Sequence, residues 1–305
     1  RDCALEVSHS MDASRLHFQI LFVDDDNAKG RIAEGLLARI AEYNDAMFVL
    51  FPASATISSS RNAPRDASAS STVVSICDSL GLCPTRSETL GTDFDLSYLD
   101  EYDLVVAMDE DIRSLILRSL PSSEDQEYYR PRCRLMSEFL SPGFVTNSMT
   151  HENCEKRTAP TNALPKQNAN NNSNNRAQLD MLDPVYQERV APWVDQVLDR
   201  SSNLFATTDL ISDWPVVESG LILASGGIAR FCLATMEAQF EAAMESLLQT
   251  NLYKKEHLEK HWDEVDMQLR RCNSVVTGYF SPGQRKKRFE RHLAKLQAKL
   301  SDQHI

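Results

Sequence analysis

Short apolar strands alternate with amphipathic helices over the first two thirds of the chain, and this alternation constrains the fold more than any other feature. His17–Val23 has the composition of a short strand buried on both faces, and Arg31–Tyr43 carries apolar residues at helical spacing. Further strands are predicted at Ala46–Phe51 and Asp103–Met108. Doubly buried strands separated by helices predict a parallel sheet with right-handed crossovers.

The segments between the strands have the periodicity of helices. A helix over Ser71–Leu80 is predicted to end at Gly81, because glycine is favoured just after a helix C-terminus. Another helix is expected directly after Asp103–Met108. The apolar spacing over Pro184–Leu204 predicts the last helix of the domain. We therefore predict an α/β fold with a parallel sheet of about four strands flanked by helices.

Composition divides the chain into parts. Residues 1–17 are predicted to be an N-terminal tail, and residues 18–205 the α/β domain. Within that domain, residues 144–178 hold almost no apolar side chains and are rich in asparagine, which predicts a disordered insert. After residue 205 the strand pattern stops, so residues 206–305 are predicted to form a helical C-terminal extension.

Charge and cysteine usage exclude several functional classes. The net charge of −12 gives no general attraction to nucleic acid, so no DNA partner is expected. The apolar runs Gln19–Val23 and Met47–Phe51 are far shorter than the roughly 20 residues that a bilayer helix needs, so we expect no transmembrane segment. Seven cysteines without a C-x-x-C pair favour reduced thiols and an intracellular location. Because the chain opens at Arg1, an organelle reached after removal of a targeting segment is as compatible as the cytoplasm.

The loop after the first strand is the first place to look for a function. Ligands of parallel α/β sheets bind at the carboxyl ends of the strands. The loop Asp24–Arg31 stands at such an end, and four short motifs follow it along the chain. These motifs are Ala33-Glu34-Gly35, then Ser54-Ala55-Thr56, then the run Tyr102–Asp109, and finally Asp183-Pro184-Val185-Tyr186.

In this order and at this spacing, the loop and the four motifs resemble the low-molecular-weight protein tyrosine phosphatases. The resemblance covers residues 18–142 and 179–205. It implies a phosphate-binding loop after the first strand, in which a cysteine thiolate attacks phosphorus and an arginine binds the phosphate oxygens in a bidentate fork. It also implies no cofactor and no metal.

The loop departs from the family pattern at the residues that carry the chemistry. In place of Val-Cys-x-Gly-Asn-x-Cys-Arg-Ser the chain has Val23–Arg31, in which Asp24 falls on the nucleophilic cysteine and Asn27 on the asparagine. Gly30 falls on the arginine, unless a slip of one residue lets Arg31 serve as the phosphate clamp. None of the seven cysteines has an arginine six positions later. The remaining positions of the implied phosphate loop are Asp25, Asp26, Asn27, Ala28, Lys29 and Gly30.

Asp183 falls on the general acid of the family, and Tyr186 matches one of two tyrosines that follow it, whereas Val185 replaces the other. A structural alternative is that Asp183 caps the last helix, with Pro184 in the first helical position. Met108-Asp109 resembles a strand-end pair of the family whose role we interpret as scaffolding.

The run Asp24-Asp25-Asp26 also fits other chemistry. Response-regulator receivers place paired acids after a strand, but the next strand-end aspartate, Asp109, lies too far along the chain. Haloacid-dehalogenase-type phosphatases use an aspartate nucleophile with magnesium, although no matching downstream lysine and paired aspartates are found. Magnesium or calcium binding by the three carboxylates is a simpler variant, and capping of the following helix is a structural one.

The C-terminal extension has no counterpart in the resemblance. Helices are predicted over Ile228–Leu252, His257–Arg271 and Gln284–Leu300, the last with basic residues beside its apolar stripe. That helix either docks on an acidic protein, RNA or an anionic membrane, or packs its basic face on acidic groups of the same chain.

The sequence thus predicts a phosphatase-like protein without catalytic activity, a pseudophosphatase that serves as a binding or scaffold module. An unidentified protein partner is expected to bind through residues 228–300. The alternatives are an active phosphatase with Asp24 as an unusual nucleophile and a magnesium-dependent aspartyl phosphatase.

Overall fold

The structure is a computed structural model that describes residues 17–47, 49–57, 71–82, 92–140, 179–206 and 213–249, together with 262, 266–267, 283, 285–291 and 294. The tail predicted before His17, the asparagine-rich segment 144–178 and most of the helix predicted over His257–Arg271 lie outside the described residues. The chain divides into two compact units, and the division falls between Cys232 and Leu233.

A parallel sheet forms the centre of the first unit. Its five strands have the order β3-β2-β1-β4-β5, and all four pairings are parallel. The central strand β1 is buried at every residue except the half-buried Gln19. The prediction of a parallel α/β sheet of about four strands is therefore confirmed, with a two-residue edge strand added. The strands are β1 (Phe18–Asp24), β2 (Leu50–Thr56), β3 (Thr92–Asp93), β4 (Leu104–Ala107) and β5 (Cys133–Leu135).

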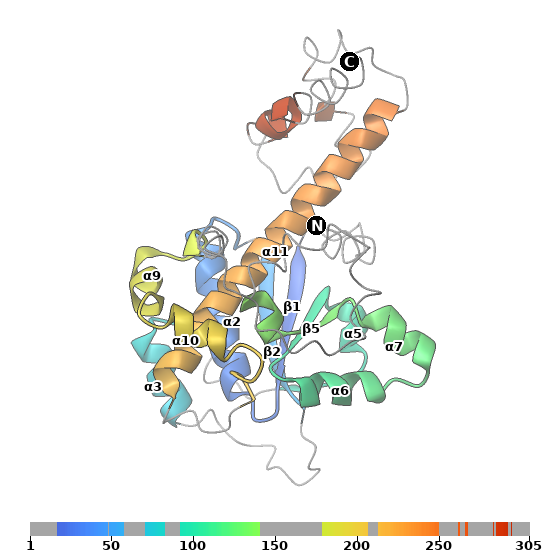
Figure 1. Ribbon diagram of the computed structural model, residues 1–305. Coiled ribbons are helices and arrows are strands. Elements are labelled where there is room, and N and C mark those ends of the chain that lie inside the picture. The colour runs from blue at the N-terminus through green and yellow to red at the C-terminus, as the bar shows by residue number, and fades with distance from the viewer. Residues whose placement is uncertain are drawn as a thin grey trace, which may run out of the picture. The chain divides into compact units, whose positions relative to one another are not determined.

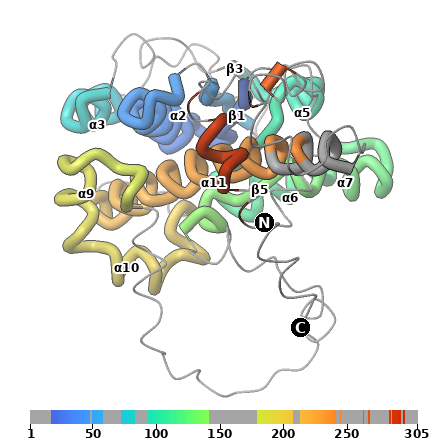
Figure 2. The backbone as a smooth tube through the Cα atoms, turned by 90° about the horizontal axis from the view of Figure 1, so that it is seen from above, coloured from blue at the N-terminus to red at the C-terminus, as the bar shows by residue number. Residues whose placement is uncertain are grey.

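Helices cover both faces of the sheet. From β1 the chain passes through α2 (Ala28–Tyr43) to β2 and through α3 (Ser71–Ser79) to β3, whereas α6 (Glu110–Arg118) and α7 (Ser123–Tyr129) connect β4 to β5 on the other side of β1. Right-handed crossovers in opposite directions place their helices on opposite faces. Figures 1 and 2 both show α2 and α3 to the left of the strands and α6 and α7 to the right. The direction of winding reverses at β1, which makes its carboxyl end the expected ligand position.

The second strand lies later in the chain than predicted. It runs over Leu50–Thr56 instead of Ala46–Phe51, so the motif Ser54-Ala55-Thr56 is part of the strand and does not follow it. The prediction was wrong because Pro52 and small polar residues give this strand the composition of a loop. Among the described residues, β3 pairs only with Ala55 and Thr56 at the end of β2, so no described strand lies beside Pro52 on that side, and a proline is tolerated there.

The helix predicted over Pro184–Leu204 is interrupted. The structure has α9 (Pro184–Val190) and α10 (Val194–Asp199) instead. Pro192 lies between them, and proline removes a backbone donor and clashes with the preceding turn of a helix. The apolar periodicity continues across the break, because both short helices bury one face on the same unit. Two further short elements are α5 (Tyr98–Glu101) and the 3-10 helix η1 (Met136–Leu140).

The long helix α11 (Trp214–Gln249) begins 14 residues before the predicted start at Ile228. Its part up to Cys232 belongs to the same compact unit as the sheet, beyond the domain boundary that the sequence suggested near residue 205. The segment Trp214–Phe240 is long and apolar enough to cross a membrane by length and composition, with a mean hydropathy of 1.5, but 83% of its most apolar window is buried inside the protein. A helix that is apolar all round is expected when protein covers every side of it.

Close packing of α11 on η1 depends on a glycine. A Cβ atom placed on Gly227 would lie 2.3 Å from the backbone oxygen of Phe139. The rings of Phe139 and Phe231 meet edge to face with centroids 5.7 Å apart. A second glycine, Gly220, faces a side chain and not backbone, because its Cβ would lie 2.3 Å from Cδ2 of Leu204.

Replacement of Gly227 by alanine is expected to lower the free energy of unfolding by about 1–3 kcal/mol, because backbone must move to admit the methyl group. Gly220→Ala is the matched control. It should lower the free energy of unfolding by less, since the Leu204 side chain can change rotamer. Denaturant unfolding followed by circular dichroism measures both. Helix propensity alone would raise the free energy of unfolding of Gly227→Ala by about 1 kcal/mol. Such a rise would contradict the close packing.

Candidate functional site

The carboxyl group of Asp24 lies at the carboxyl end of β1 and is fully buried. Its Oδ2 accepts hydrogen bonds from the backbone N–H groups of Lys29 at 2.8 Å and Gly30 at 3.2 Å, both in the first turn of α2. Backbone N–H groups at a helix N-terminus are the donors that bind phosphate in many proteins. In this chain two of them are already bound to its own carboxylate.

The two following aspartates bind neighbouring donors. Oδ1 of Asp26 accepts from the N–H group of Ala28 at 2.9 Å, and Oδ1 of Asp25 accepts from the N–H group of Asp26 at 2.9 Å. Both side chains are exposed. The interpretation that these carboxylates cap the following helix is therefore confirmed for Asp24 and Asp26, which satisfy the first three N–H groups of α2.

A buried lysine balances part of the negative charge. Lys29 is 5% exposed, and its Nζ lies 3.4 Å from Oδ1 of Asp24. Burial is the largest effect on Asp24 and raises its pKa to about 7, whereas Lys29 lowers that pKa and the nearby Asp26 and Asp25 raise it. The pKa of Asp24 therefore lies well above that of a carboxyl group in water.

Asn27 gives the loop its sharp turn into α2. Its backbone has φ 58° and ψ 18°, a left-handed conformation that asparagine tolerates better than most residues. The side chain is 3% exposed, and neither its Oδ1 nor its Nδ2 has a hydrogen-bond partner in the described part of the chain. A Cβ on Gly30 would lie 2.7 Å from Oδ1 of Asn27. Position 30, where the family has its arginine, therefore has no room for a larger side chain unless Asn27 moves.

Arg31 is half-buried in the first turn of α2, and its N–H group donates to the carbonyl oxygen of Asn27 at 3.2 Å. Its charge reaches α3, where it lowers the pKa of Cys77, although burial of that thiol has the larger effect and raises the pKa. The role of Arg31 as a phosphate clamp stays a prediction.

Two of the sequence motifs meet beside this loop. Oγ of Ser54 in β2 donates to Oε2 of Glu34 in α2 at 2.7 Å. Ser54 is 9% exposed, and its Cβ lies 3.7 Å from the position of a Cβ on Gly30. Sequence reasoning did not find this pair. The only indication was that one motif follows the first strand and the other was predicted to follow the second, which lies beside it.

Asp183 caps α9, because its Oδ1 accepts from the N–H group of Tyr186 at 3.0 Å. The capping interpretation is thus confirmed. The carbonyl oxygen of Met181 accepts from Nδ2 of Asn44, the residue that ends α2. Because the 16 residues of α2 span about 24 Å, Asp183 lies near the end of α2 opposite to Asp24. The structure does not bring the predicted general acid and the predicted nucleophile position together.

Tyr186 anchors α9 to the end of α3. Its hydroxyl donates to the carbonyl oxygen of Leu80 at 2.9 Å, and burial raises its pKa to about 12. The neighbouring Val185 is 64% exposed. Of the two positions where the family has tyrosines, the one that is a tyrosine here is therefore a buried structural contact.

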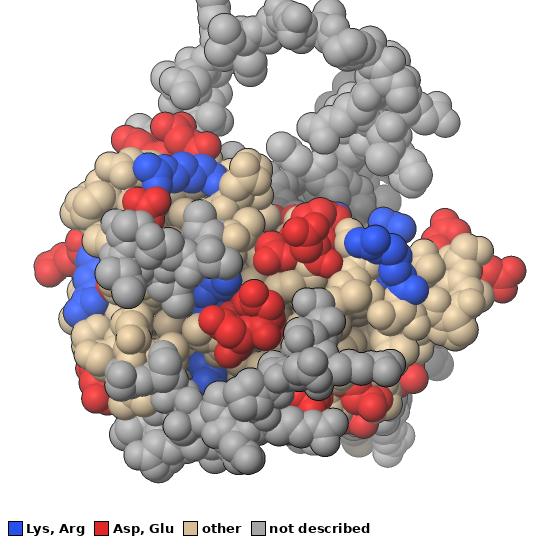
Figure 3. Space-filling view, turned by 90° about the horizontal axis from the view of Figure 1, so that it is seen from below, with Lys and Arg blue, Asp and Glu red and all other residues tan. Residues whose placement is uncertain are grey.

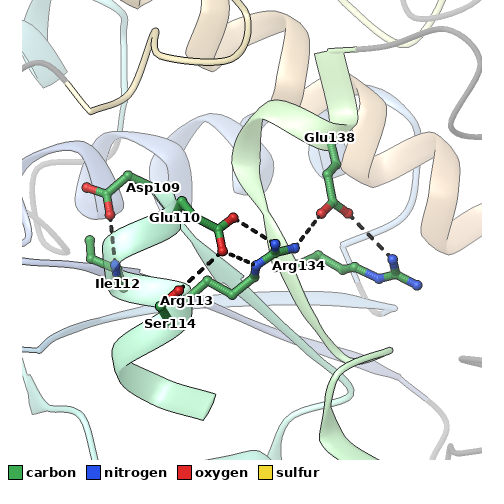
Figure 4. Close-up of polar contacts among 7 residues, drawn as sticks. All are labelled: Asp109, Glu110, Ile112, Arg113, Ser114, Arg134 and Glu138. Carbon is green, nitrogen blue, oxygen red and sulfur yellow. Dashed lines mark hydrogen bonds and ion pairs between the residues drawn. The ribbon is translucent and has the colours of Figure 1, made fainter. Parts of the chain in front are cut away.

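Asp109 at the end of β4 has a structural role, as predicted. Its Oδ1 accepts from the N–H group of Ile112 at 2.8 Å and so caps α6 (Figure 4). The guanidinium group of Arg113 forms two ion pairs (Figure 4). Its Nη2 lies 2.7 Å from Oε2 of Glu110 in the same helix, and its Nη1 lies 2.9 Å from Oε1 of Glu138 in η1. These bonds fix α6 to the segment after β5.

The described thiols are not poised for nucleophilic attack. Cys77, Cys133 and Cys232 are all buried. Burial raises the pKa of Cys133 to about 12 and that of Cys232 well above the ordinary value, so these thiols stay protonated. The other cysteines lie outside the described residues; they are Cys3, Cys83, Cys154 and Cys272.

The surface offers no continuous basic field for an anion in the view of Figure 3. Acidic patches and smaller groups of Lys and Arg alternate there among the described residues. This agrees with the net charge of −12.

The chain matches no protein-family model and no curated protein. Among solved structures it is similar to a protein tyrosine phosphatase from Entamoeba histolytica, with 15% identity over 70% of this chain and 94% of that chain and a TM-score of 0.38. It is also similar to YfkJ from Bacillus subtilis, with 14% identity over 73% and 96% and a TM-score of 0.37. A YwlE mutant from Bacillus subtilis has 18% identity over 41% and 74% and a TM-score of 0.34, and YwlE is described as an arginine phosphatase. Likenesses this low carry nothing about activity, so the functional case depends on the residues of this chain.

The buried Asp24 should make the free energy of unfolding fall as the pH rises. Because the folded chain holds this proton up to a pKa of about 7, whereas an unperturbed aspartate has a pKa of 3.8, the contribution to stability is fully present below pH 3.8 and is lost as the pH rises through about 7. The loss is at most about 4 kcal/mol. Denaturant unfolding between pH 4.5 and 8 in EDTA measures it.

The control for this prediction removes both buried charges. The double variant Asp24→Asn/Lys29→Gln keeps acceptors for the N–H groups of Lys29 and Gly30 and should lack this pH-dependent loss. An identical pH dependence in the variant and the natural chain would contradict the raised pKa of Asp24.

Proposed function

We propose that the protein is a phosphatase-like fold without phosphatase activity, a pseudophosphatase that acts as a binding module. One observation carries the proposal. Oδ2 of Asp24 occupies the N–H groups of Lys29 and Gly30, at the position where the resemblance implies a thiolate nucleophile beneath a bound phosphate. The loop therefore satisfies its own donors with a carboxylate.

Covalent phosphoryl transfer needs a nucleophile that can reach phosphorus. The side chain of Asp24 is fully buried, holds two backbone N–H groups and lies beside Lys29. A carboxylate in this position cannot attack a substrate without rearrangement of the loop. The thiols of the described residues are buried and protonated, so they supply no substitute.

Charge also opposes phosphate binding. Asp25 and Asp26 are exposed beside the N-terminus of α2. The repulsion between two like charges about 4 Å apart is about 4 kcal/mol at an effective dielectric constant of 20. A phosphate dianion carries two negative charges, so its repulsion by a nearby carboxylate is larger. Lys29 offsets part of this repulsion, but its charge is already shared with Asp24.

We place the binding role in the C-terminal unit, which begins at Leu233 and holds most of the predicted partner segment 228–300. Arg285 there is buried and forms two bonds with Asp266, at 2.6 and 2.9 Å, and Arg288 lies 3.1 Å from Glu237. These two arginines therefore pack on acidic groups of their own unit. The exposed basic side chains of the same helix remain for a partner; they are Lys286, Lys287 and Arg291.

No hydrolysis of an aryl phosphate is expected, with or without magnesium, because the loop lacks both a thiolate and a clamp at position 30. The assay compares the full chain with Asp24→Ala. Turnover that requires both magnesium and Asp24 would favour an aspartyl phosphatase. Turnover without metal that survives Asp24→Ala would contradict both readings of the loop.

Phosphate or vanadate should not raise the melting temperature of the full chain. A ligand stabilises a protein only to the extent that it binds the folded state, and Asp24 already occupies two of the N–H donors. Thermal unfolding with millimolar phosphate, against equal ionic strength of chloride, is the measurement. A saturable rise in melting temperature would show that the loop opens to anions.

A further inference from the structure

Two helical segments of the C-terminal unit run antiparallel. The ring centroids of Trp262 and Phe289 lie 5.1 Å apart. One turn away, the guanidinium group of Arg285 donates two hydrogen bonds to the carboxylate of Asp266, at 2.6 and 2.9 Å. In each helical segment the two contact residues are four positions apart, and their order is reversed between the segments, which defines the antiparallel arrangement. These contacts turn Arg285 and Phe289 inward, where each is 4% exposed.

The other side of the helix that contains Arg285 carries three exposed cations, which we call the basic face; they are Lys286, Lys287 and Arg291. Lys287 and Arg291 are four positions apart and therefore lie on the same side of the helix. The neighbouring Arg288 is held by the unit itself, because its Nη2 lies 3.1 Å from Oε1 of Glu237 in α11. Within the described part of the unit, the ion pairs of this helix are those of Arg285 and Arg288, so the charges of the basic face are open to a partner.

A membrane surface does not match this helix. Helices that lie in a bilayer interface bury an apolar face in it. Phe289 is buried against Trp262, and the exposed described positions of the helix outside the basic face are Gly283, Glu290 and Ala294. At the described positions, no large apolar side chain is left to enter a bilayer.

A nucleic acid does not match the helix either. Glu290 is exposed four positions after Lys286, so a carboxylate lies among the three cations. A uniform row of phosphates would meet this carboxylate in every register, whereas a protein segment can place a neutral or basic side chain opposite it. Stacking of bases needs aromatic side chains, and the exposed described positions of this helix have none. An acidic polypeptide is therefore the partner that fits this pattern of charges.

We propose that the basic face binds an acidic segment of a partner protein. Carboxylates of that segment pair with Lys286, Lys287 and Arg291, and a neutral or basic side chain of the segment lies opposite Glu290. The inference rests on the proposed function only in that it places the partner in the C-terminal unit. It does not depend on the absence of phosphatase activity, because hydrolysis of an aryl phosphate tests that absence, whereas binding is measured without substrate.

Binding is tested with the full chain and a labelled peptide of about 20 residues that is rich in glutamate, with alanine and lysine interspersed. Fluorescence anisotropy should show saturable binding that weakens as the salt concentration rises, because salt screens exposed charges. Poly(U) RNA and vesicles of phosphatidylserine and phosphatidylcholine are the comparisons, and both should bind more weakly than the peptide. The absence of saturable peptide binding, or equal or tighter binding of the RNA or the vesicles, would overturn the proposal.

Charge reversal separates the basic face from a general attraction between the peptide and cationic side chains. Lys287→Glu/Arg291→Glu should weaken peptide binding at least tenfold, and both residues are exposed, so the fold is expected to persist. The matched control Arg118→Glu/Arg130→Glu changes the net charge equally at exposed positions of the first unit and should leave the affinity unchanged. Equal losses of affinity in the two variants would contradict a defined binding surface.

Release of Arg288 from its ion pair tests the position of the surface. Glu237→Gln removes the partner of Arg288 and should tighten peptide binding at least twofold, because a further cation then becomes available beside Lys287. The matched control Glu218→Gln makes the same change of charge and releases Arg189, which lies 2.7 Å from Glu218 in the first unit. This control should leave the affinity unchanged. Equal tightening in the two variants, or none in Glu237→Gln, would refute the placement of the acidic segment on this helix.

Discussion

The hydrogen bonds from the N–H groups of Lys29 and Gly30 to the buried carboxylate of Asp24 determine the character of the loop. They place an acid beneath the N-terminus of α2, where a phosphatase of this type would need a thiolate and free donors. Burial of that acid requires a nearby cation, which Lys29 supplies, and raises the pKa of Asp24 to about 7. The unsuitability of the loop for phosphate follows from this carboxylate.

The surrounding fold has the general form that the resemblance implies, but the other motif residues have structural roles. Asp183 caps α9 near the far end of α2, and Asp109 caps α6. Tyr186 donates to Leu80 and joins α9 to α3. Aspartate and tyrosine can both serve in catalysis. Here the two aspartates cap helices and the tyrosine joins two helices.

Much of the fold followed from periodicity. The parallel sheet, α2, α3 with Gly81 after it, and the helix after β4 were predicted, because continuous apolar runs and helical spacing depend on neighbouring residues alone. The shift of β2 was not predicted, since Pro52 and small polar residues give this strand the composition of a loop. Nor was the contact of Ser54 with Glu34, which depends on the alignment of β2 beside β1.

The sequence by itself determined that aspartate replaces the nucleophilic cysteine at position 24 and that position 30 is a glycine, since these are matters of residue identity. Only the tertiary structure decided where the replacement carboxylate lies, that Lys29 is buried with it, and that the amide of Asn27 is buried with no hydrogen-bond partner in the described segments. Only the tertiary structure separates Asp183 from Asp24 along α2. The amino-acid sequence fixes which chemical groups are available. Packing fixes the solvation and the neighbours of each group, and these two properties set its charge state and its reactivity.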